Sequence, residues 1–281
     1  MSSRPAHGQL SDPRAVMRPM PAAETSRRTF LTGGAVLVGA VLAGCAGSSD
    51  DDGGGEASGA STTSSEGAGT PATTAEAGAT LTAADFASLG TCRLTPEQTE
   101  GPFYSDVGLD RRDITEGLAG HPLRLGVRVV DAKCNPVPGA VVDVWHCDVD
   151  GDYSAFSDGA GSNDDAGEGT TFLRGSQVAD QDGIVEFATN YPGWYQGRAV
   201  HIHTKVRLDA AAVLTTQLYF PEDLTDEVHA EDPYAAHGTR DTRNEDDAIA
   251  GDPAANGNLL TTSAAGTGTL GLVVLGVDPE A

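Results

Sequence analysis

The stretch PLRLGVRVV (122–130) carries apolar side chains at positions 123, 125, 127 and 129, with arginine or glycine between them. This period of two is typical of a β-strand that has one buried face. The segment that follows, NPVPG (135–139), predicts a turn, and residues 140–145 predict a second strand. We therefore expect these two strands to form a β-hairpin.

Four more stretches have the composition of strands, and helical periodicity is weak except over 82–87. These strands are expected at 183–187, 199–208, 213–220 and 270–277. Short strands separated by glycine and proline turns predict an all-β fold, with a β-sandwich core of mostly antiparallel strands, long loops and little helix. A doubly wound α/β fold is not expected.

The first third of the chain has the features of a targeting segment. The motif SRRTFL (26–31) is a twin-arginine pair ahead of an apolar run, 35–42, that is too short to span a bilayer. The motif LAGC (42–45) resembles the bacterial lipobox, in which the cysteine is lipidated. We expect residues 1–45 to direct export by the twin-arginine route, with a lipid anchor at Cys45 on the outer side of the cytoplasmic membrane.

The residues after Cys45 divide into two parts. Residues 46–82 consist mainly of Gly, Ser, Thr, Ala and acidic residues, so they cannot bury enough apolar surface to fold. This composition predicts a flexible linker. Residues 83–281 are long enough for one domain with a sizeable core. We expect this domain to carry the function.

The charge excludes one class of partner. The 281 residues include 41 acidic and 17 basic side chains, which gives a formal charge of -24. Such a chain repels polyanions, so no nucleic-acid partner is expected, and the acidic surface is explained by solubility. The acidic stretch from Glu222 to Asp252 is expected to form solvated loops, with a short helix, around one edge of the functional site.

Three cysteines remain after Cys45, at positions 92, 134 and 147. An exported protein permits a disulfide, and three thiols leave one of them unpaired. All three pairings are open, and we favour Cys92 with Cys134. Cys147 is then expected to be a small, buried structural thiol.

The motif WYQGRAVHIHT (194–204) indicates a metal site. His201 and His203 alternate along a predicted strand, so they project to one side and can hold one ion. Tyr195 precedes them, and Tyr153 ends the motif WHCDVDGDY (145–153). A phenol has a pKa near about 10, so it serves as an anionic ligand at neutral pH only beside a highly charged cation. Two phenols with two imidazoles therefore favour a ferric ion.

Taken in order, five motifs resemble the intradiol ring-cleavage dioxygenase family. They are TPEQTEGPFY (95–104), WHCDVDGDY (145–153), YPGWY (191–195), RAVHIH (198–203) and TQLYF (216–220). The resemblance covers about 83–281 and is closer to the protocatechuate 3,4-dioxygenase branch than to the catechol 1,2-dioxygenases. It implies a β-sandwich enzyme with one non-haem ferric ion per chain. Such an enzyme uses O2 to cleave a catechol between its two hydroxylated carbons, and it releases a cis,cis-muconate-type diacid that contains both oxygen atoms.

The resemblance also assigns roles to individual residues. Tyr153 and His201 correspond to equatorial ligands, and Tyr195 and His203 to axial ligands. Catechol would bind in place of Tyr195, which would take up a substrate proton. Arg198 corresponds to the arginine that stabilises negative charge on the substrate, and Gln217 to a glutamine near the oxygen-binding side.

One departure leaves the substrate open. Only five residues separate Tyr195 from His201, fewer than in the larger protocatechuate enzymes, so the pocket wall differs. The particular catechol and the oligomeric state are not fixed by the sequence.

Two alternatives to the dioxygenase remain. The first is a non-catalytic cell-surface β-sandwich binding module, since residues 137–141 are similar to the opening of such repeats. The second is a zinc or copper enzyme that uses His201, His203 and a carboxylate. The other histidines lie outside the ligand pattern. His146 is inside the first motif, and the histidines expected on the surface are His121, His229 and His237.

Overall fold

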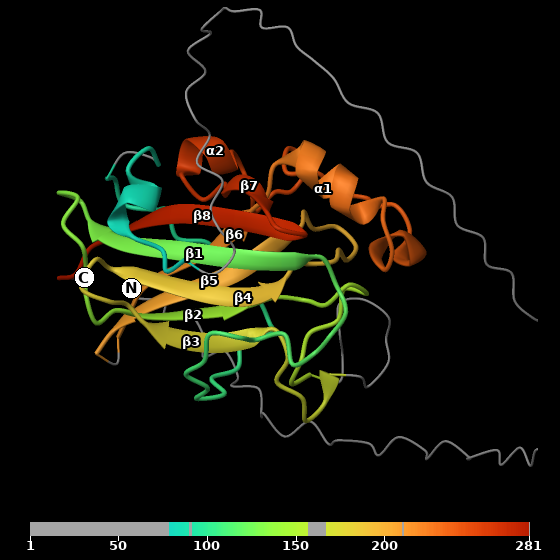
Figure 1. Ribbon diagram of the computed structural model, residues 1–281, viewed down its shortest axis with the longest axis horizontal. Coiled ribbons are helices and arrows are strands. Elements are labelled where there is room, and N and C mark those ends of the chain that lie inside the picture. The colour runs from blue at the N-terminus through green and yellow to red at the C-terminus, as the bar shows by residue number, and fades with distance from the viewer. Residues whose placement is uncertain (1–78, 90–91, 157–166, 210, 281) are drawn as a thin grey trace, which may run out of the picture. The chain divides into compact units, whose positions relative to one another are not determined.

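The computed structural model describes residues 79–89, 92–156, 167–209 and 211–280, which form a sandwich of two four-stranded sheets (Figure 1). The first sheet has the order β4-β1-β8-β7 and the second has the order β3-β2-β5-β6. The first sheet consists of β1 (Pro122–Asp131), β4 (Ile184–Asn190), β7 (Thr261–Ala265) and β8 (Gly268–Val277). The second consists of β2 (Val141–Trp145), β3 (Arg174–Val178), β5 (His201–Leu208) and β6 (Ala211–Tyr219). Only β1 and β8 pair in parallel among these neighbours, so the predicted all-β, mostly antiparallel fold is confirmed.

Helices are short and few in the part of the chain that the structure describes. They are the 3-10 helix η1 (Ala83–Phe86), α1 (Glu222–His229), the 3-10 helix η3 (Tyr234–His237) and α2 (Pro253–Asn256). The weak helical pattern over 82–87 corresponds to η1. None of these described helices is long and apolar enough to cross a membrane.

Two strands escape the sequence analysis because they lack an apolar alternation. The strand β3 has the sequence RGSQV and β7 has the sequence TTSAA. Both lie at the edge of their sheet, and the residues of β7 are exposed or half-buried. An edge strand can form from such residues because its neighbour supplies the hydrogen bonds and much of the packing.

The predicted hairpin of β1 and β2 is wrong, because the two strands lie in different sheets. The chain does turn back on β1, where Val130 and Pro136 form an isolated antiparallel bridge and Val137 N donates to Val129 O over 3.1 Å. Prolines at 136 and 138 have no backbone N–H, so the ladder stops there. Gly139, with φ +80°, redirects the chain to the second sheet.

The core lies between the two sheets and fixes which residues face outward. Even-numbered residues of β2 and β5, such as Val142, Val144, Ile202 and Val206, belong to this core. Alternation then sends the odd-numbered residues of the same strands to the outer face of the second sheet. The predicted His-x-His pair therefore lies outside the sandwich core.

The packed domain begins earlier than the sequence analysis predicts. Leu81, inside the expected linker 46–82, is 5% exposed and packs with Phe86 of η1. A side chain at Gly126 of β1 would come within 2.4 Å of Leu81, so this glycine makes room for the segment. The signal segment 1–45 and most of the linker lie outside the described residues, and export and lipidation stay predictions.

The disulfide prediction is confirmed. Cys92 and Cys134 are joined, which ties the segment before β1 to the turn that leaves it. Cys147 is a buried free thiol, as expected.

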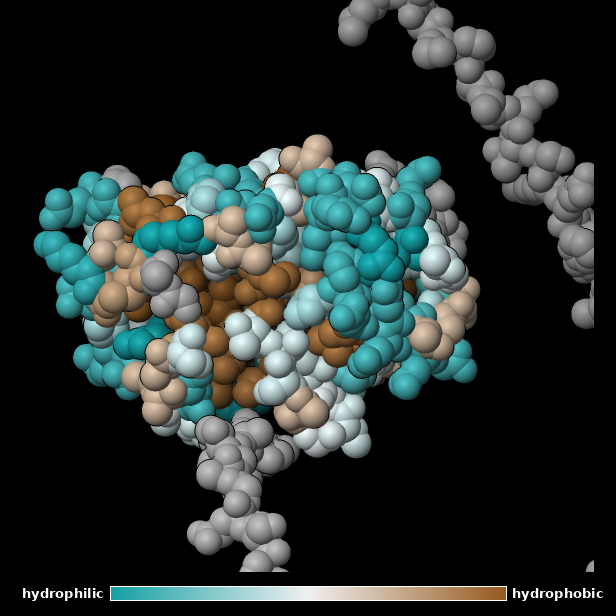
Figure 2. Space-filling view, turned by 90° about the horizontal axis from the view of Figure 1, so that it is seen from above, coloured by the Kyte–Doolittle hydropathy of each residue, from teal (hydrophilic) through white to brown (hydrophobic). Residues whose placement is uncertain are grey.

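The side of the molecule that carries α1, α2 and β7 has apolar side chains gathered in a hollow between polar ones (Figure 2). A cavity of about 540 Å³ is lined by residues of β8, by Leu89 and Arg93, and by residues 254–257. None of the four predicted metal ligands lines it.

Replacing Phe86 by alanine is expected to lower the free energy of unfolding by about 3–5 kcal/mol, because a buried aromatic side chain is lost from the cluster under η1. Urea denaturation measures the change. The matched control is Leu94→Ala, which removes a side chain that is 49% exposed and should alter stability by less than about 0.5 kcal/mol. Equal effects of the two substitutions would show that η1 is not part of the domain.

Candidate metal centre

The outer face of the second sheet carries an ordered row of functional side chains. In the sheet register, Arg174 pairs with Trp145, Trp145 with His203, and His203 with Gln217. Directly paired residues of a sheet point to the same face, so these four side chains form one row across β3, β2, β5 and β6. His201 pairs with Tyr219 in the adjacent part of the same face.

Two loops bring the predicted tyrosines to this row. Tyr153 comes from the loop after β2, and Tyr195 comes from the loop before β5. The loops are locked together at Gly193, whose N–H donates to Asp148 O over 3.0 Å and where a side chain would clash with backbone oxygens. The Cys147 thiol donates to Gly193 O over 3.6 Å, which gives this buried cysteine a structural role.

The four predicted ligand side chains converge. His201 Nε2 and His203 Nε2 lie 3.1 Å apart, and Tyr195 Oη lies 3.2 Å from His201 Nε2. The Tyr153 ring centroid lies 5.9 Å from those of both Tyr195 and His203. The sequence placed these residues in two separate motifs, and the fold gathers them at one point.

The donor set fits a metal ion. Two nitrogen donors bound at about 2.1 Å and at right angles to each other lie about 3 Å apart, close to the separation of the two Nε2 atoms. His201 Nδ1 donates to Ala199 O over 2.6 Å, which leaves the lone pair of Nε2 directed at the site. The buried Tyr153 hydroxyl has no well-formed hydrogen bond within the described residues, so an ion there would satisfy it.

Burial keeps the donor groups in their uncharged forms. It lowers the pKa of His201 to about 3, with the Arg198 charge as the second cause, and it lowers the pKa of His203 well below its usual value. Burial also raises the pKa of Tyr195 to about 12 and raises that of Tyr153 strongly. Neutral imidazoles are the ligand form, whereas these phenols ionise at neutral pH only if a cation replaces the lost hydration.

Aromatic rings and one glycine fix the ligand orientations. The Phe103 ring stacks on Tyr153 at 4.5 Å, and the Trp145 ring stacks on His203 at 4.9 Å. Gly101 lies against the imidazole of His203, since a Cβ there would be 3.1 Å from His203 Cε1. The two stacking residues, Phe103 and Trp145, are therefore walls of the site.

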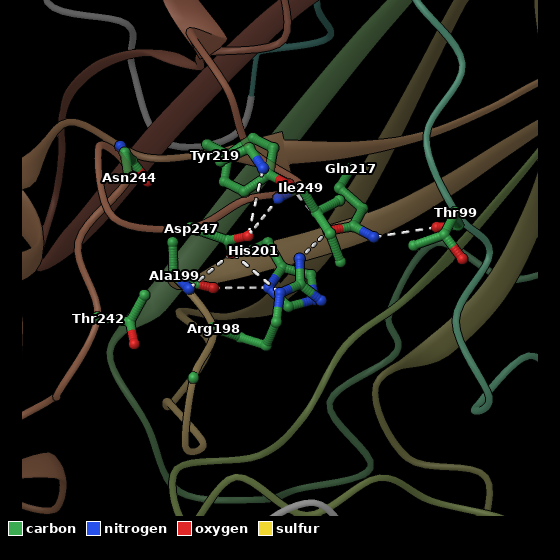
Figure 3. Close-up of polar contacts among 12 residues, drawn as sticks. Thr99, Arg198, Ala199, His201, Gln217, Tyr219, Thr242, Asn244, Asp247 and Ile249 are labelled. Carbon is green, nitrogen blue, oxygen red and sulfur yellow. Dashed lines mark hydrogen bonds and ion pairs between the residues drawn. The ribbon is translucent and has the colours of Figure 1, made fainter.

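Arg198 and Gln217 meet beside the ligands (Figure 3). Arg198 Nη2 donates to Gln217 Oε1, and Arg198 Nη1 lies 3.4 Å from Tyr195 Oη. Gln217 Oε1 also accepts from Tyr219 Oη over 2.9 Å, while Gln217 Nε2 donates to Thr99 O over 3.0 Å. Both predicted residues thus lie at the site, and the amide of Gln217 serves to hold Arg198.

Asp247 is the residue that the sequence analysis misses. The stretch Glu222–Asp252 was expected to form solvated loops, and its short helix is confirmed as α1. Asp247, however, is only 3% exposed and accepts a hydrogen bond from Arg198 Nε over 2.9 Å. Nothing in the acidic run distinguishes it from its exposed neighbour Asp246.

The four other histidines in the described residues lie outside the ligand set, and they are less exposed than expected. His229 donates to Pro192 O and His237 donates to Trp194 O, each over 3.0 Å, and both are half-buried. They support the loop that carries Tyr195. His121 is half-buried beside Thr269, and His146 is buried against Thr189.

The predicted alternative of a zinc or copper site with a carboxylate does not form in the described residues. No group of three or more His, Cys, Asp or Glu side chains there is arranged to hold a metal ion. The oxygen donors beside the histidine pair are instead the phenols of Tyr195 and Tyr153.

Gly101→Ala is expected to weaken Fe³⁺ binding, because the added Cβ would push the ring of His203. The left-handed backbone, with φ +72°, adds a loss of about 1–2 kcal/mol of stability. Ferric titration followed by absorbance, together with urea denaturation, separates the two effects. Gly108→Ala is the control, since Gly108 has φ +62° and open space around it. Equal Fe³⁺ affinity in the two variants would contradict the proposed contact.

The iron-free protein is expected to lose stability as the pH falls from 7 to 5. Folded His146 and His201 have pKa values lowered to about 4 and about 3, chiefly by burial, while unfolded histidine titrates near about 6.5. The unfolded chain then binds protons that the folded chain does not, at a cost of about 2 kcal/mol per histidine at pH 5. Urea denaturation at both pH values tests this. His146→Gln should show a smaller loss, and an unchanged loss would contradict the assignment.

Comparisons with known proteins agree with this geometry. A family model described as Dioxygenase matches residues 99–245, just over half of the chain. Chlorocatechol 1,2-dioxygenase of Rhodococcus opacus is 30% identical over 50% of this chain and 62% of its own length. Catechol 1,2-dioxygenase of Acinetobacter baylyi is 32% identical over 48% of this chain and 49% of its own length. The match thus spans 62% and 49% of the length of these two curated relatives, less than two thirds of either.

Solved structures show the same relationship. An intradiol ring-cleavage dioxygenase from Tetranychus urticae has a TM-score of 0.62 and 29% identity, covering 68% of this chain and 96% of that chain. The dioxygenase domain of a dioxygenase and carbohydrate-binding fusion protein from Streptomyces sp. SirexAA-E has a TM-score of 0.51 and 30% identity, covering 66% of this chain and 99% of that one. Because the matched range 99–245 contains the whole second sheet and all four converging side chains, the chain belongs to the family of intradiol ring-cleavage dioxygenases.

Proposed function

We propose that this protein is a non-haem ferric dioxygenase that uses O2 to cleave a catechol between its two hydroxylated carbons, giving a cis,cis-muconate-type diacid. The observation that carries the proposal is the meeting of two phenols with two imidazole Nε2 atoms that lie 3.1 Å apart. Tyr153, Tyr195, His201 and His203 would hold one Fe³⁺. When bound, the ferric ion supplies a Lewis acid that activates the catechol toward O2.

The exposure of the ligands indicates the side from which substrate enters. Tyr153, His201 and His203 are buried, whereas Tyr195 and Arg198 are half-buried. A planar catechol therefore reaches the site along the Tyr195 edge. Of the two stacked walls, Trp145 is buried and backs the closed side of the site, whereas Phe103 is half-buried.

The half-buried side chains act on the substrate. Tyr195 Oη is the atom of this chain best placed to take up a proton from a catechol hydroxyl. The Arg198 guanidinium, 3.4 Å from that oxygen, provides a fixed positive charge where negative charge develops on the ring. Gln217, by accepting from Arg198, keeps this charge in place.

The two curated relatives named above act on chlorocatechol and catechol, as their names state, and this supports a catecholic substrate. Membership of the protocatechuate 3,4-dioxygenase branch remains a prediction from the sequence. Export and membrane anchoring through Cys45 would place the reaction outside the cytoplasm, and the motifs in residues 26–45 support this location.

The proposal is tested by the absorption spectrum of the full chain with its metal content, before and after anaerobic addition of catechol. We expect one Fe³⁺ per chain and a broad visible tyrosinate-to-iron band that shifts with catechol. Admission of O2 should then yield the ring-opened diacid. A protein that stays colourless after ferric reconstitution would contradict the proposal and favour a binding module.

Tyr153→Phe should weaken this band, because it removes a phenolate ligand. It should also reduce kcat/KM by more than about 100-fold, since losing a residue that merely hydrogen-bonds to a metal ligand already costs about 10- to 100-fold. The matched control is Tyr191→Phe, in the same YPGWY motif as Tyr195. The Tyr191 hydroxyl lies 2.8 Å from Thr225 Oγ1 in the core, away from the ligands. If both variants kept the wild-type band, Tyr153 would not be a ligand.

A further inference from the structure

We propose that Asp247 is a positioning residue of the metal centre, whose single carboxylate fixes both the substrate-facing Arg198 and the backbone that orients His201. This inference rests on the proposed function. Asp247 is separated from both residues by more than forty positions in sequence, and it comes from the acidic segment after η3 (Figure 3).

The two oxygens of Asp247 do different things. Oδ1 accepts from the backbone N–H groups of Ile249, over 2.8 Å, and Ala250, over 3.3 Å, and so closes its own loop. Oδ2 points to the site, where it accepts from Arg198 Nε and Ala199 N, each over 2.9 Å. A carboxylate needed only for the loop would require Oδ1 alone.

The first contact of Oδ2 fixes the guanidinium of Arg198. Arginine has a long side chain with several rotatable bonds, and ordering it costs entropy that a fixed partner offsets. With Nε held by Asp247, Nη2 reaches Gln217 and Nη1 faces Tyr195 Oη. The positive charge is therefore presented at the Tyr195 edge in one orientation before substrate arrives.

The second contact reaches His201 through Ala199. The N–H of Ala199 donates to Asp247, and the carbonyl of the same residue accepts from His201 Nδ1 over 2.6 Å. This carbonyl fixes the tautomer in which Nε2 carries the lone pair. Asp247 thus fixes the backbone of Ala199, and Ala199 in turn orients the imidazole of His201.

Asp247 retains its charge in this buried place. Burial raises its pKa, but the N–H groups of Ala199 and Ile249 and the charge of Arg198 outweigh burial and lower it overall. The carboxylate and the guanidinium form an ion pair in which only 15% of the Arg198 side chain is exposed. Removing one member of such a pair leaves the other charge without its partner in a buried place, which is strongly unfavourable.

Asp247→Asn in the full chain tests the proposal. The amide oxygen can keep the Oδ1 contacts with the loop, but the amide nitrogen at the Oδ2 position would face two donors. We expect kcat/KM per bound iron with catechol to fall by about 10- to 100-fold, mainly through kcat. We also expect the visible band of the substrate-free ferric protein to shift, which a purely structural role would not cause.

The matched control is Asp246→Asn, which removes the same charge at the exposed neighbouring position. It should leave kcat/KM, the visible band and the melting temperature unchanged. If Asp247→Asn differs from Asp246→Asn only in melting temperature, the positioning role is overturned. If Asp247→Asn does not fold, Asp247→Glu takes its place, because it keeps the charge and displaces the oxygen. Wild-type kcat/KM in D247E would overturn the proposal.

A double-mutant cycle with Arg198→Gln gives a second, independent test. Because Asp247 acts in part through Arg198, the combined loss of kcat/KM should be smaller than the product of the two single losses. Losses that multiply fully would contradict this. A wild-type protein without a visible band or ring cleavage would instead overturn the proposed function, so the two failures are distinguishable.

Discussion

The site depends on the register of β5 between β2 and β6. A strand has a side-chain period of two, so a slip of one residue would send His201 and His203 into the sandwich core and bring Ile202 to the outer face. The buried even-numbered residues of β5 prevent this slip, because they would lose their places in the core. The same packing that stabilises the domain therefore fixes the direction in which the imidazoles point.

The two arginines near the ligands, Arg198 and Arg174, have different kinds of partner. Arg198 is paired with Asp247, whereas Arg174, only 2% exposed, donates to neutral oxygens of Ser154 and Phe103. Arg174 thus ties the loop that bears Tyr153 to β3 and to the segment that bears the stacking Phe103. Burial lowers the pKa of Arg174 to about 10, and it stays a cation at neutral pH.

The sequence predicts those strands and site residues that are marked by a pattern within a short stretch of the chain. Six strands, the His-x-His pair and both tyrosines are recognisable from alternation and motif, and the structure brings the four side chains together. The failures have physical causes. β3 and β7 lie at sheet edges and lack apolar alternation, and β1 pairs with β4 and β8, which are distant in sequence, while Pro136 and Pro138 interrupt pairing with the segment that follows β1. Asp247 has no local signal, since its burial results from a long-range contact with Arg198.

Because the ligands lie on the outer face of a sheet, different residues stabilise the fold and build the substrate site. Apolar packing between the sheets provides stability, while the loops that carry Tyr153, Tyr195 and Asp247 surround the ligand groups. A substitution beside Tyr195, for instance at the exposed Gln196, removes no side chain from the core between the two sheets. Changes in the loop sequences can therefore alter which aromatic substrate is bound while the free energy of folding stays nearly constant.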